Sequence, residues 1–210
     1  MKNILVFLVA GVMLAARNFV IRGNHVIGNG VKAEKSFDLG PFDAVSVNGS
    51  ADVVFVQGLQ KVLLVADENL LELFEIEVKD GTLRIGTKKG CGYSTKNDVV
   101  VFVNSPVLNA AKINGSGSFE IDGPLAVDGD FSLSVNGSGE IEVDALTAGS
   151  ASVKVNGSGD VKLNCREVGD IVVGINGSGD VELLGNARNV RSKINGSGNV
   201  NTRRLVLAGN

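Results

Sequence analysis

Apolar and polar residues alternate strictly along much of the C-terminal half of the chain. Between Val153 and Asn164, valine, leucine or glycine occupies every second position, and polar or charged residues occupy the positions between them. A period of two is typical of a β-strand with one buried face and one solvent-exposed face. The same phase holds around residues 113–121, 135–143, 175–183 and 194–200. The pattern therefore predicts an all-β protein made of repeated strands.

A short phrase, Ile/Val-Asn-Gly-Ser-Gly, lies at the centre of each alternating segment. Its asparagines are separated by 22, 20, 20 and 19 residues: Asn114, Asn136, Asn156, Asn176 and Asn195. A near-constant period of about 20 residues is typical of a solenoid, in which one coil cannot bury its own apolar side alone. No helical pattern separates the copies, which argues against βαβ crossovers. We expect a single-stranded right-handed parallel β-helix with rungs of about 20 residues.

An earlier copy of the phrase begins at Val47 and is followed by a less regular section. The 66 residues from Asn48 to Asn114 amount to about three periods and contain strand-like runs at 74–78, 82–85 and 99–103. We expect the solenoid to continue through this section, with a turn at Asp80-Gly81. The first glycine of the phrase has no exception and is the candidate for a positive φ. Because Ala51 replaces the second glycine, small size is expected to matter at that position.

The N-terminus has the pattern of a signal peptide. Lys2 precedes an apolar run over 4–16, which is too short to span a bilayer and has the length of a signal-peptide core. Cleavage near Ala16 would export the protein to the periplasm or the cell surface; an uncleaved anchor or a buried first strand are the alternatives. No later segment reads as membrane-spanning. The expected organisation is a signal peptide at 1–16, an N-terminal extension at 17–35 and one β-helix domain at 36–210.

Charge and cysteine content narrow the range of partners. The net charge is −3 and no basic cluster is present along the sequence, so nucleic acid is not an expected partner. Cys91 and Cys165 are 74 residues apart, and stacked rungs spaced about 4.8 Å apart would hold them beyond disulfide reach. We expect two free thiols, with Cys165 on the buried side as a small core residue.

The residues that usually carry catalysis are sparse. His25 is the one histidine and has no serine or cysteine partner in a recognisable nucleophile setting. No His/Cys pair has zinc-ligand spacing, and no glycine loop leads from a strand into a helix. We therefore predict no enzymatic activity and no cofactor.

Stacked rungs would align equivalent polar residues in columns along the solenoid. Two columns hold asparagine and serine, and the central rungs contribute Asn136, Ser138, Asn156, Ser158, Asn176 and Ser178. These side chains either bond to one another and to the turns or form a repetitive surface that binds a glycan. A third column aligns Glu140, Asp160 and Asp180. It is a candidate cation site, for which a solvated acidic face is the alternative.

Taken together, these phrases resemble the head GIN domain family, which is described as an autotransporter adhesin family of bacterial envelopes. The resemblance rests on the repeated Asn-Gly-Ser-Gly phrases, on the segment from Phe42 to Val53 and on that from Asp80 to Ile85, and it covers roughly residues 36–205. It implies an extracytoplasmic β-helix-like fold and offers no catalytic residues. No translocator barrel is evident in the sequence.

These observations favour a non-enzymatic extracytoplasmic protein that binds or adheres through a repetitive polar surface. Its expected partner is a glycan or another envelope or extracellular polymer. One alternative is a structural scaffold that self-assembles as a homo-oligomer through exposed β-helix ends. The other is a polysaccharide-cleaving β-helix enzyme, which would need a groove with convergent acids and an arginine.

Overall fold

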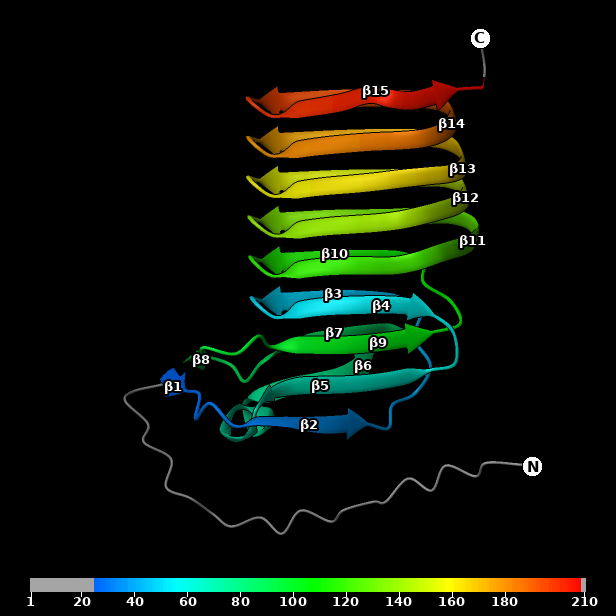
Figure 1. The fold of residues 1–210 in the computed structure, drawn as a ribbon. Coiled ribbons are helices and arrows are strands. Elements are labelled where there is room, and N and C mark those ends of the chain that lie inside the picture. Colours follow the sequence, from blue (N-terminus) through cyan, green and yellow to red (C-terminus); the bar gives the residue numbers. More distant parts are fainter. Residues whose placement is uncertain (1–24, 209–210) are drawn as a thin grey trace, which may run out of the picture.

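The computed structural model describes residues 25–208, which form a parallel β-solenoid of about five turns (Figure 1). The chain climbs as a right-handed coil, and the rungs are about 20 residues long, so the predicted fold is confirmed. The predicted signal peptide at 1–16 and the extension up to residue 24 lie outside the described residues. Between residues 25 and 208, no helix has the length and apolar character needed to cross a membrane.

Residues 25–208 contain fifteen strands and one short 3-10 helix. The strands before the regular rungs are β1 (His25–Ile27), β2 (Lys32–Phe37), β3 (Ala44–Gly49), β4 (Asp52–Gln57), β5 (Lys61–Asp67), β6 (Phe74–Lys79), β7 (Thr82–Thr87), β8 (Gly92–Ser94) and β9 (Val100–Ser105), with the helix η1 (Glu68–Leu73) after β5. The later strands are β10 (Ala110–Gly115), β11 (Ser118–Gly137), β12 (Glu140–Gly157), β13 (Asp160–Gly177), β14 (Asp180–Gly196) and β15 (Asn199–Leu207).

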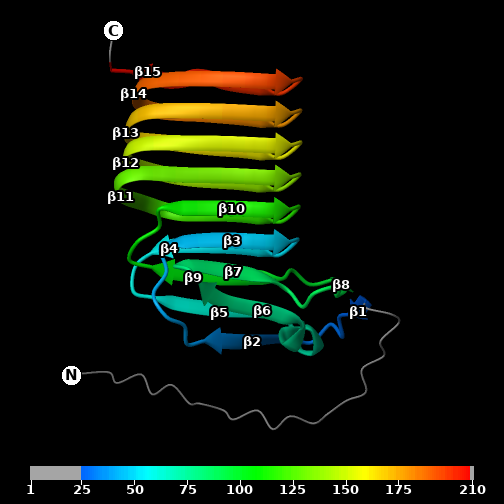
Figure 2. The ribbon, with the colours of Figure 1, turned by 180° about the vertical axis from the view of Figure 1, so that it is seen from behind.

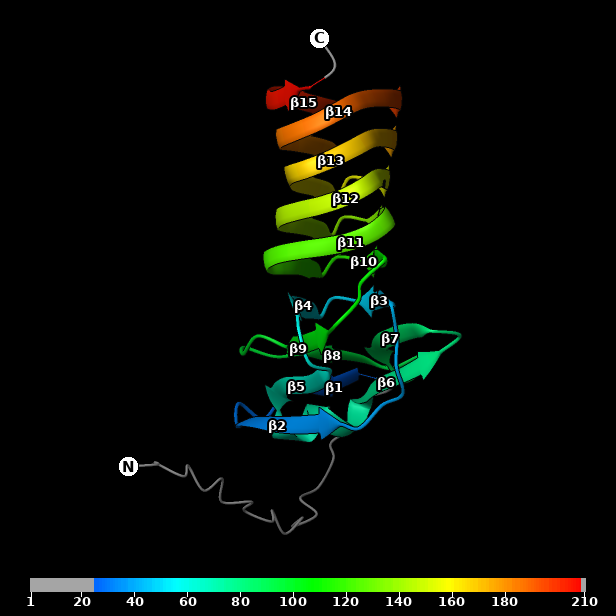
Figure 3. The same ribbon diagram turned by 90° about the vertical axis from the view of Figure 1, so that its right-hand side faces the viewer.

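Each regular rung consists of two walls joined by a tight corner and a wide bend (Figures 2 and 3). One wall, called here the ladder wall, contains β7, β3, β10 and the C-terminal parts of β11 to β14. The opposite wall, called the acidic wall, contains β9, β4, the N-terminal parts of β11 to β14, and β15. The Asn-Gly-Ser-Gly phrase forms the tight corner between the two walls, and the long strands β11 to β14 run continuously around the wide bend.

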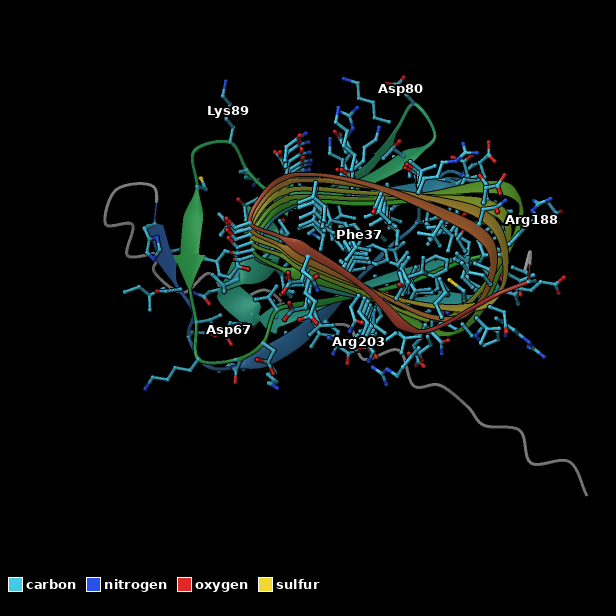
Figure 4. The ribbon with its side chains drawn as sticks, turned by 90° about the horizontal axis from the view of Figure 1, so that it is seen from above. Phe37, Asp67, Asp80, Lys89, Arg188 and Arg203 are labelled. Atoms are coloured by element: carbon cyan, nitrogen blue, oxygen red, sulfur yellow. The ribbon has the colours of Figure 1, made fainter. Side chains whose placement is uncertain are left out.

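The core consists of stacked apolar columns between the two walls, as the alternation predicts (Figure 4). The residue before each Asn of the phrase is fully buried and pairs in register with its counterpart in the next rung: Val47, Ile113, Val135, Val155 and Ile175. In the last rung the equivalent Ile194 is 40% exposed, because no further rung within the described residues covers it. Cys165 is a buried core residue in the column of Leu146, and both cysteines are free, as predicted.

The section between Asn48 and Asn114 departs from the predicted solenoid. β3 pairs directly with β10, so Asn48 and Asn114 lie in adjacent rungs although about three periods of chain separate them. Of the intervening strands, β7 and β9 stack in parallel beneath β3 and β4, whereas β5 and β6 pair antiparallel with β9 and β7. Because alternation with a period of two is common to both strand orientations, the sequence pattern could not distinguish them. The predicted turn is confirmed: Asp80 and Gly81 both have positive φ, as a type I′ hairpin requires.

The antiparallel strands form a cap over the N-terminal end of the solenoid. β2 pairs with β5, so the fold includes residues 32–35, which the sequence analysis placed in the N-terminal extension. Phe37, at the end of β2, packs against the end of the core (Figure 4). Asp67 ties the cap to the β8–β9 connection, since its buried carboxylate accepts hydrogen bonds from Thr95 Oγ1 at 2.7 Å and Asn97 Nδ2 at 2.5 Å. Although burial favours the neutral acid, these hydrogen bonds lower the pKa of Asp67 below its ordinary value.

Candidate binding surface

The tight corners carry the predicted polar columns. Each corner needs glycine at two positions, for two different reasons. The first glycine of each phrase has a positive φ, for example +128° at Gly157 and +132° at Gly137, which L-residues adopt poorly. The second glycine does not need a positive φ, but a Cβ on Gly159 would lie 2.3 Å from the carbonyl oxygen of Gly139. Both sequence predictions about the phrase are therefore confirmed: the first glycine supplies backbone freedom and the second supplies space.

The asparagine column forms a continuous hydrogen-bonded ladder from Asn48 to Asn195. In each step the side-chain amide donates to the side-chain oxygen in the rung below, at 2.8 to 3.0 Å. Asn136, Asn156 and Asn176 belong to this ladder, so one N–H and one lone pair of each central amide stabilise the stack. The second N–H of each amide remains for water or a ligand.

The serine column is exposed at the corner and, unlike the asparagine column, forms no side-chain ladder in the central rungs. The backbone N–H of Ser138, Ser158 and Ser178 donates to the carbonyl of the first glycine in the rung below, at 2.8 to 3.0 Å. Their side chains are exposed, and their hydroxyls make no hydrogen bond to any other residue within 25–208. Ser50 is the exception, because its hydroxyl lies 3.1 Å from the Tyr93 hydroxyl of β8. The central serine hydroxyls are therefore available to a ligand.

The acidic column is in register, but its carboxylates also bond to the backbone. Asp160 Oδ1 accepts the backbone N–H of Asp180 at 2.9 Å, and Asp180 Oδ1 accepts that of Asn199 at 3.0 Å. Glu140 pairs with Asp160 in the next rung. In the described part of the chain, no group of three or more His, Cys, Asp or Glu side chains is placed to hold a metal ion. Cation binding by Glu140, Asp160 and Asp180 stays a prediction, and the observed role of Asp160 and Asp180 is to satisfy turn N–H groups.

The two walls carry opposite charge, which the linear sequence did not suggest. On the acidic wall, residues 118–122, 140–144, 160–164 and 180–184 contain eight acids and one lysine, and β15 in the last rung adds Arg203 and Arg204, the second of which pairs with Glu182. That lysine, Lys162, forms an ion pair with Glu142, which raises the pKa of Lys162. On the ladder wall, residues 110–114, 132–136, 152–156, 172–176 and 191–195 contain no acid and four exposed basic residues: Lys112, Lys154, Arg191 and Lys193. The one sequence signal that could have revealed the positive column is the recurrence of lysine two residues before Asn114, Asn156 and Asn195.

A shallow depression marks the wide bend of the later rungs. Its lining residues come from equivalent positions of successive rungs: Thr147, Gly149, Glu167, Gly169, Asn186 and Arg188. The Arg188 guanidinium lies 3.7 Å from the Asp170 carboxylate, and both side chains are well exposed. Cys165, in the core near this bend, has its thiol pKa raised to about 12 by burial, so it is not a reactive group.

The sequence matches one protein family over most of its length. The family described as "Putative auto-transporter adhesin, head GIN domain" matches residues 41–209. A comparison with curated proteins found no match.

Several solved structures share the fold at low sequence identity. A "putative adhesin" from Bacteroides fragilis is 16% identical, with a TM-score of 0.64 over 86% of this chain and 100% of that one. A "putative adhesin" from Parabacteroides distasonis is 25% identical, with a TM-score of 0.58 over 87% and 100% of the two chains. A "Putative lipid binding protein" from Parabacteroides distasonis is 22% identical, with a TM-score of 0.57 over 87% and 99%.

Proposed function

The chain belongs to the head GIN domain family, and from that premise we propose that it is a non-enzymatic adhesion protein of the cell envelope that binds an extended polymer along its solenoid axis. The observation that carries the proposal is the in-register repetition of exposed polar groups over the central rungs. A polymer can make the same contact with each rung, at intervals of about 4.8 Å. The family name and the adhesin names of the structural relatives point in the same direction.

The proposed contact surface is the corner formed by Asn136, Ser138, Asn156, Ser158, Asn176 and Ser178. Each additional hydrogen bond contributes about 0.5–1.5 kcal/mol, so affinity has to come from several rungs acting together. The test replaces Ser138, Ser158 and Ser178 together by alanine, which leaves the ladder and the backbone bonds in place. Binding is measured on an array of envelope and extracellular polysaccharides. Unchanged binding by a folded triple variant would remove the serine column from the proposal.

Export is the second part of the proposal. The pattern of Lys2 and the apolar run at 4–16 supports a signal peptide. N-terminal sequencing of protein recovered from the envelope is expected to begin near Arg17. An intact Met1 on abundant cytoplasmic protein would contradict it.

Self-assembly is a second candidate function, favoured by the open C-terminal end of the solenoid. Within residues 25–208, no strand pairs with the outer edge of β15, and Ile194 is 40% exposed whereas Ile175 is fully buried. The other end is closed by the cap. Stacking would therefore join two C-terminal ends into a closed dimer instead of a fibre. Sedimentation velocity over a range of concentrations tests this, with Ile194→Asp as the variant. A monomer at every concentration would exclude it.

A further inference from the structure

The ladder wall carries a row of positive charge whose spacing selects a class of ligand. In the column two residues before the Asn ladder, lysine alternates with small residues in successive rungs: Lys112, Ser134, Lys154, Gly174 and Lys193. All three lysines are exposed, and none forms an ion pair with another residue of the described chain. Since they occupy every second rung, their backbone positions are about 9.6 Å apart.

We propose that this row, named here the lysine face, binds a linear acidic polysaccharide that carries one carboxylate or sulfate per disaccharide. The inference rests on the proposed adhesive function and gives its ligand a chemical class and a position. A disaccharide repeat of an extended polysaccharide presents its anions at about the interval of alternate rungs. Each lysine can therefore meet one anion while the polymer lies parallel to the solenoid axis.

The neighbouring columns supply the contacts that the uncharged parts of such a polymer need. The Asn ladder lies beside the lysine column, about 6.8 Å away along each strand, and offers one free N–H in each of the central rungs to sugar hydroxyls. On the other side, Val172 is 51% exposed and provides an apolar contact for a sugar ring. The small residues Ser134 and Gly174 leave room between the lysines. Arg191, on the same side as Val172, adds a positive charge in the last rung.

The charge of the two walls also restricts where a polyanion can bind and how densely its charges can be spaced. Over the rungs formed by β11 to β14, the acidic wall with its eight acids repels a polyanion, so binding along the solenoid axis is confined to the lysine face. Nucleic acid is a poor match, because one strand carries a phosphate every ~3.4 Å, far denser than lysines at every second rung. A sparse polyanion is the partner whose charges can all be paired.

The first experiment measures binding of the full chain to immobilised hyaluronan, which has one carboxylate per disaccharide, with dextran as the neutral control. The test variant is Lys112→Gln/Lys154→Gln/Lys193→Gln. The matched control, Lys88→Gln/Lys89→Gln/Lys96→Gln, makes the same change of net charge with exposed lysines of the β7–β9 region. We expect the test variant to bind hyaluronan roughly tenfold to a hundredfold more weakly, as three exposed ion pairs acting together would give. The control should bind as the parent chain does.

A second variant tests the spacing itself. A Cβ on Gly174 meets nothing within 4 Å, and Ser134 is partly exposed, so Ser134→Lys/Gly174→Lys can place a lysine in every rung of the column. This variant should gain affinity for polygalacturonate, which has one carboxylate per sugar, by a larger factor than for hyaluronan. An equal gain for both polymers would overturn the spacing argument.

The outcomes separate this inference from the function on which it rests. If the parent chain binds a neutral polysaccharide and the lysine variants do not change that binding, the adhesive function stands and the lysine face is overturned. If hyaluronan binding is equal in the test and control variants, the lysine face is also overturned. Binding of duplex DNA as tight as that of hyaluronan would overturn the assigned ligand class. Absence of binding to every polymer would overturn both proposals.

Discussion

Replacing the corner glycines by alanine is the most direct test of why the phrase repeats. Gly157 and Gly159 lie in the same corner but have different requirements, and Gly174 lies in the ladder wall of the same solenoid with an ordinary φ. A Cβ on Gly174 would meet nothing within 4 Å, which makes Gly174→Ala the matched control. Comparing the three variants separates backbone strain from lack of space.

At Gly157 both effects act. Its φ of +128° is expected to cost about 1–3 kcal/mol for an L-residue. The added Cβ would also lie 2.3 Å from the carbonyl oxygen of Gly137, the acceptor for the backbone N–H of Ser158. Moving that oxygen away weakens the hydrogen bond and overpacks the corner, for about 1–3 kcal/mol more. Gly157→Ala is therefore expected to lower the free energy of unfolding by about 2–6 kcal/mol.

At Gly159 only space is lacking. The added Cβ would lie 2.3 Å from the carbonyl oxygen of Gly139 and 2.5 Å from Cγ1 of Val135, so Gly159→Ala should cost about 1–3 kcal/mol. Gly174→Ala should be neutral or stabilise by about 0.4–1 kcal/mol, because it restricts the unfolded chain. Urea unfolding followed by circular dichroism gives the midpoint of each variant. The slope of the unfolding free energy against urea concentration is compared between the variants, because solenoids can unfold in parts. Equal midpoints for all three variants would refute the assignment of separate roles to the two glycines.

Three further predictions follow from the hydrogen bonds and burial. Asn156→Ala removes the two ladder hydrogen bonds that join Asn156 to Asn136 and Asn176, and it should lower the free energy of unfolding by about 1–3 kcal/mol. Urea unfolding measures this change, and an unchanged midpoint would mean that the ladder adds no stability. Asp67→Asn should destabilise the cap by about 1–3 kcal/mol. The asparagine side chain has one acceptor oxygen instead of two and carries no charge, so it cannot replace both hydrogen bonds from Thr95 and Asn97. Because the pKa of Asp67 is lowered by folding, its contribution is present above pH ~4 and lost as the pH falls through its folded pKa, so parent and variant stabilities should converge in acid. Cys165 should resist thiol reagents in the folded protein and react only on unfolding, whereas Cys91 is partly exposed; rapid native labelling of both would contradict the buried position.

The sequence by itself determined the regular half of the molecule. The alternation places Val135, Val155 and Ile175 inside and Asn136, Asn156 and Asn176 outside, and the constant period puts them in register, because one shift of register would turn every side chain to the wrong face. The two glycine roles were also readable, since Ala51 tolerates one position and nothing replaces the other. The local backbone geometry and the choice of apolar face are properties that each repeat encodes within its own sequence.

Only the tertiary structure decided which distant segments meet. The direct pairing of β3 with β10, the antiparallel cap and the tie from Asp67 to Asn97 depend on contacts between segments with the same alternation, so the pattern alone left their partners open. The separation of charge is decided in the same way. Lys154 and Asp160 are six residues apart in the sequence, yet the corner between them turns one toward the ladder wall and the other toward the acidic wall. A candidate surface with one sign of charge exists only after the coil has formed, because folding is what collects residues about 20 positions apart into one column.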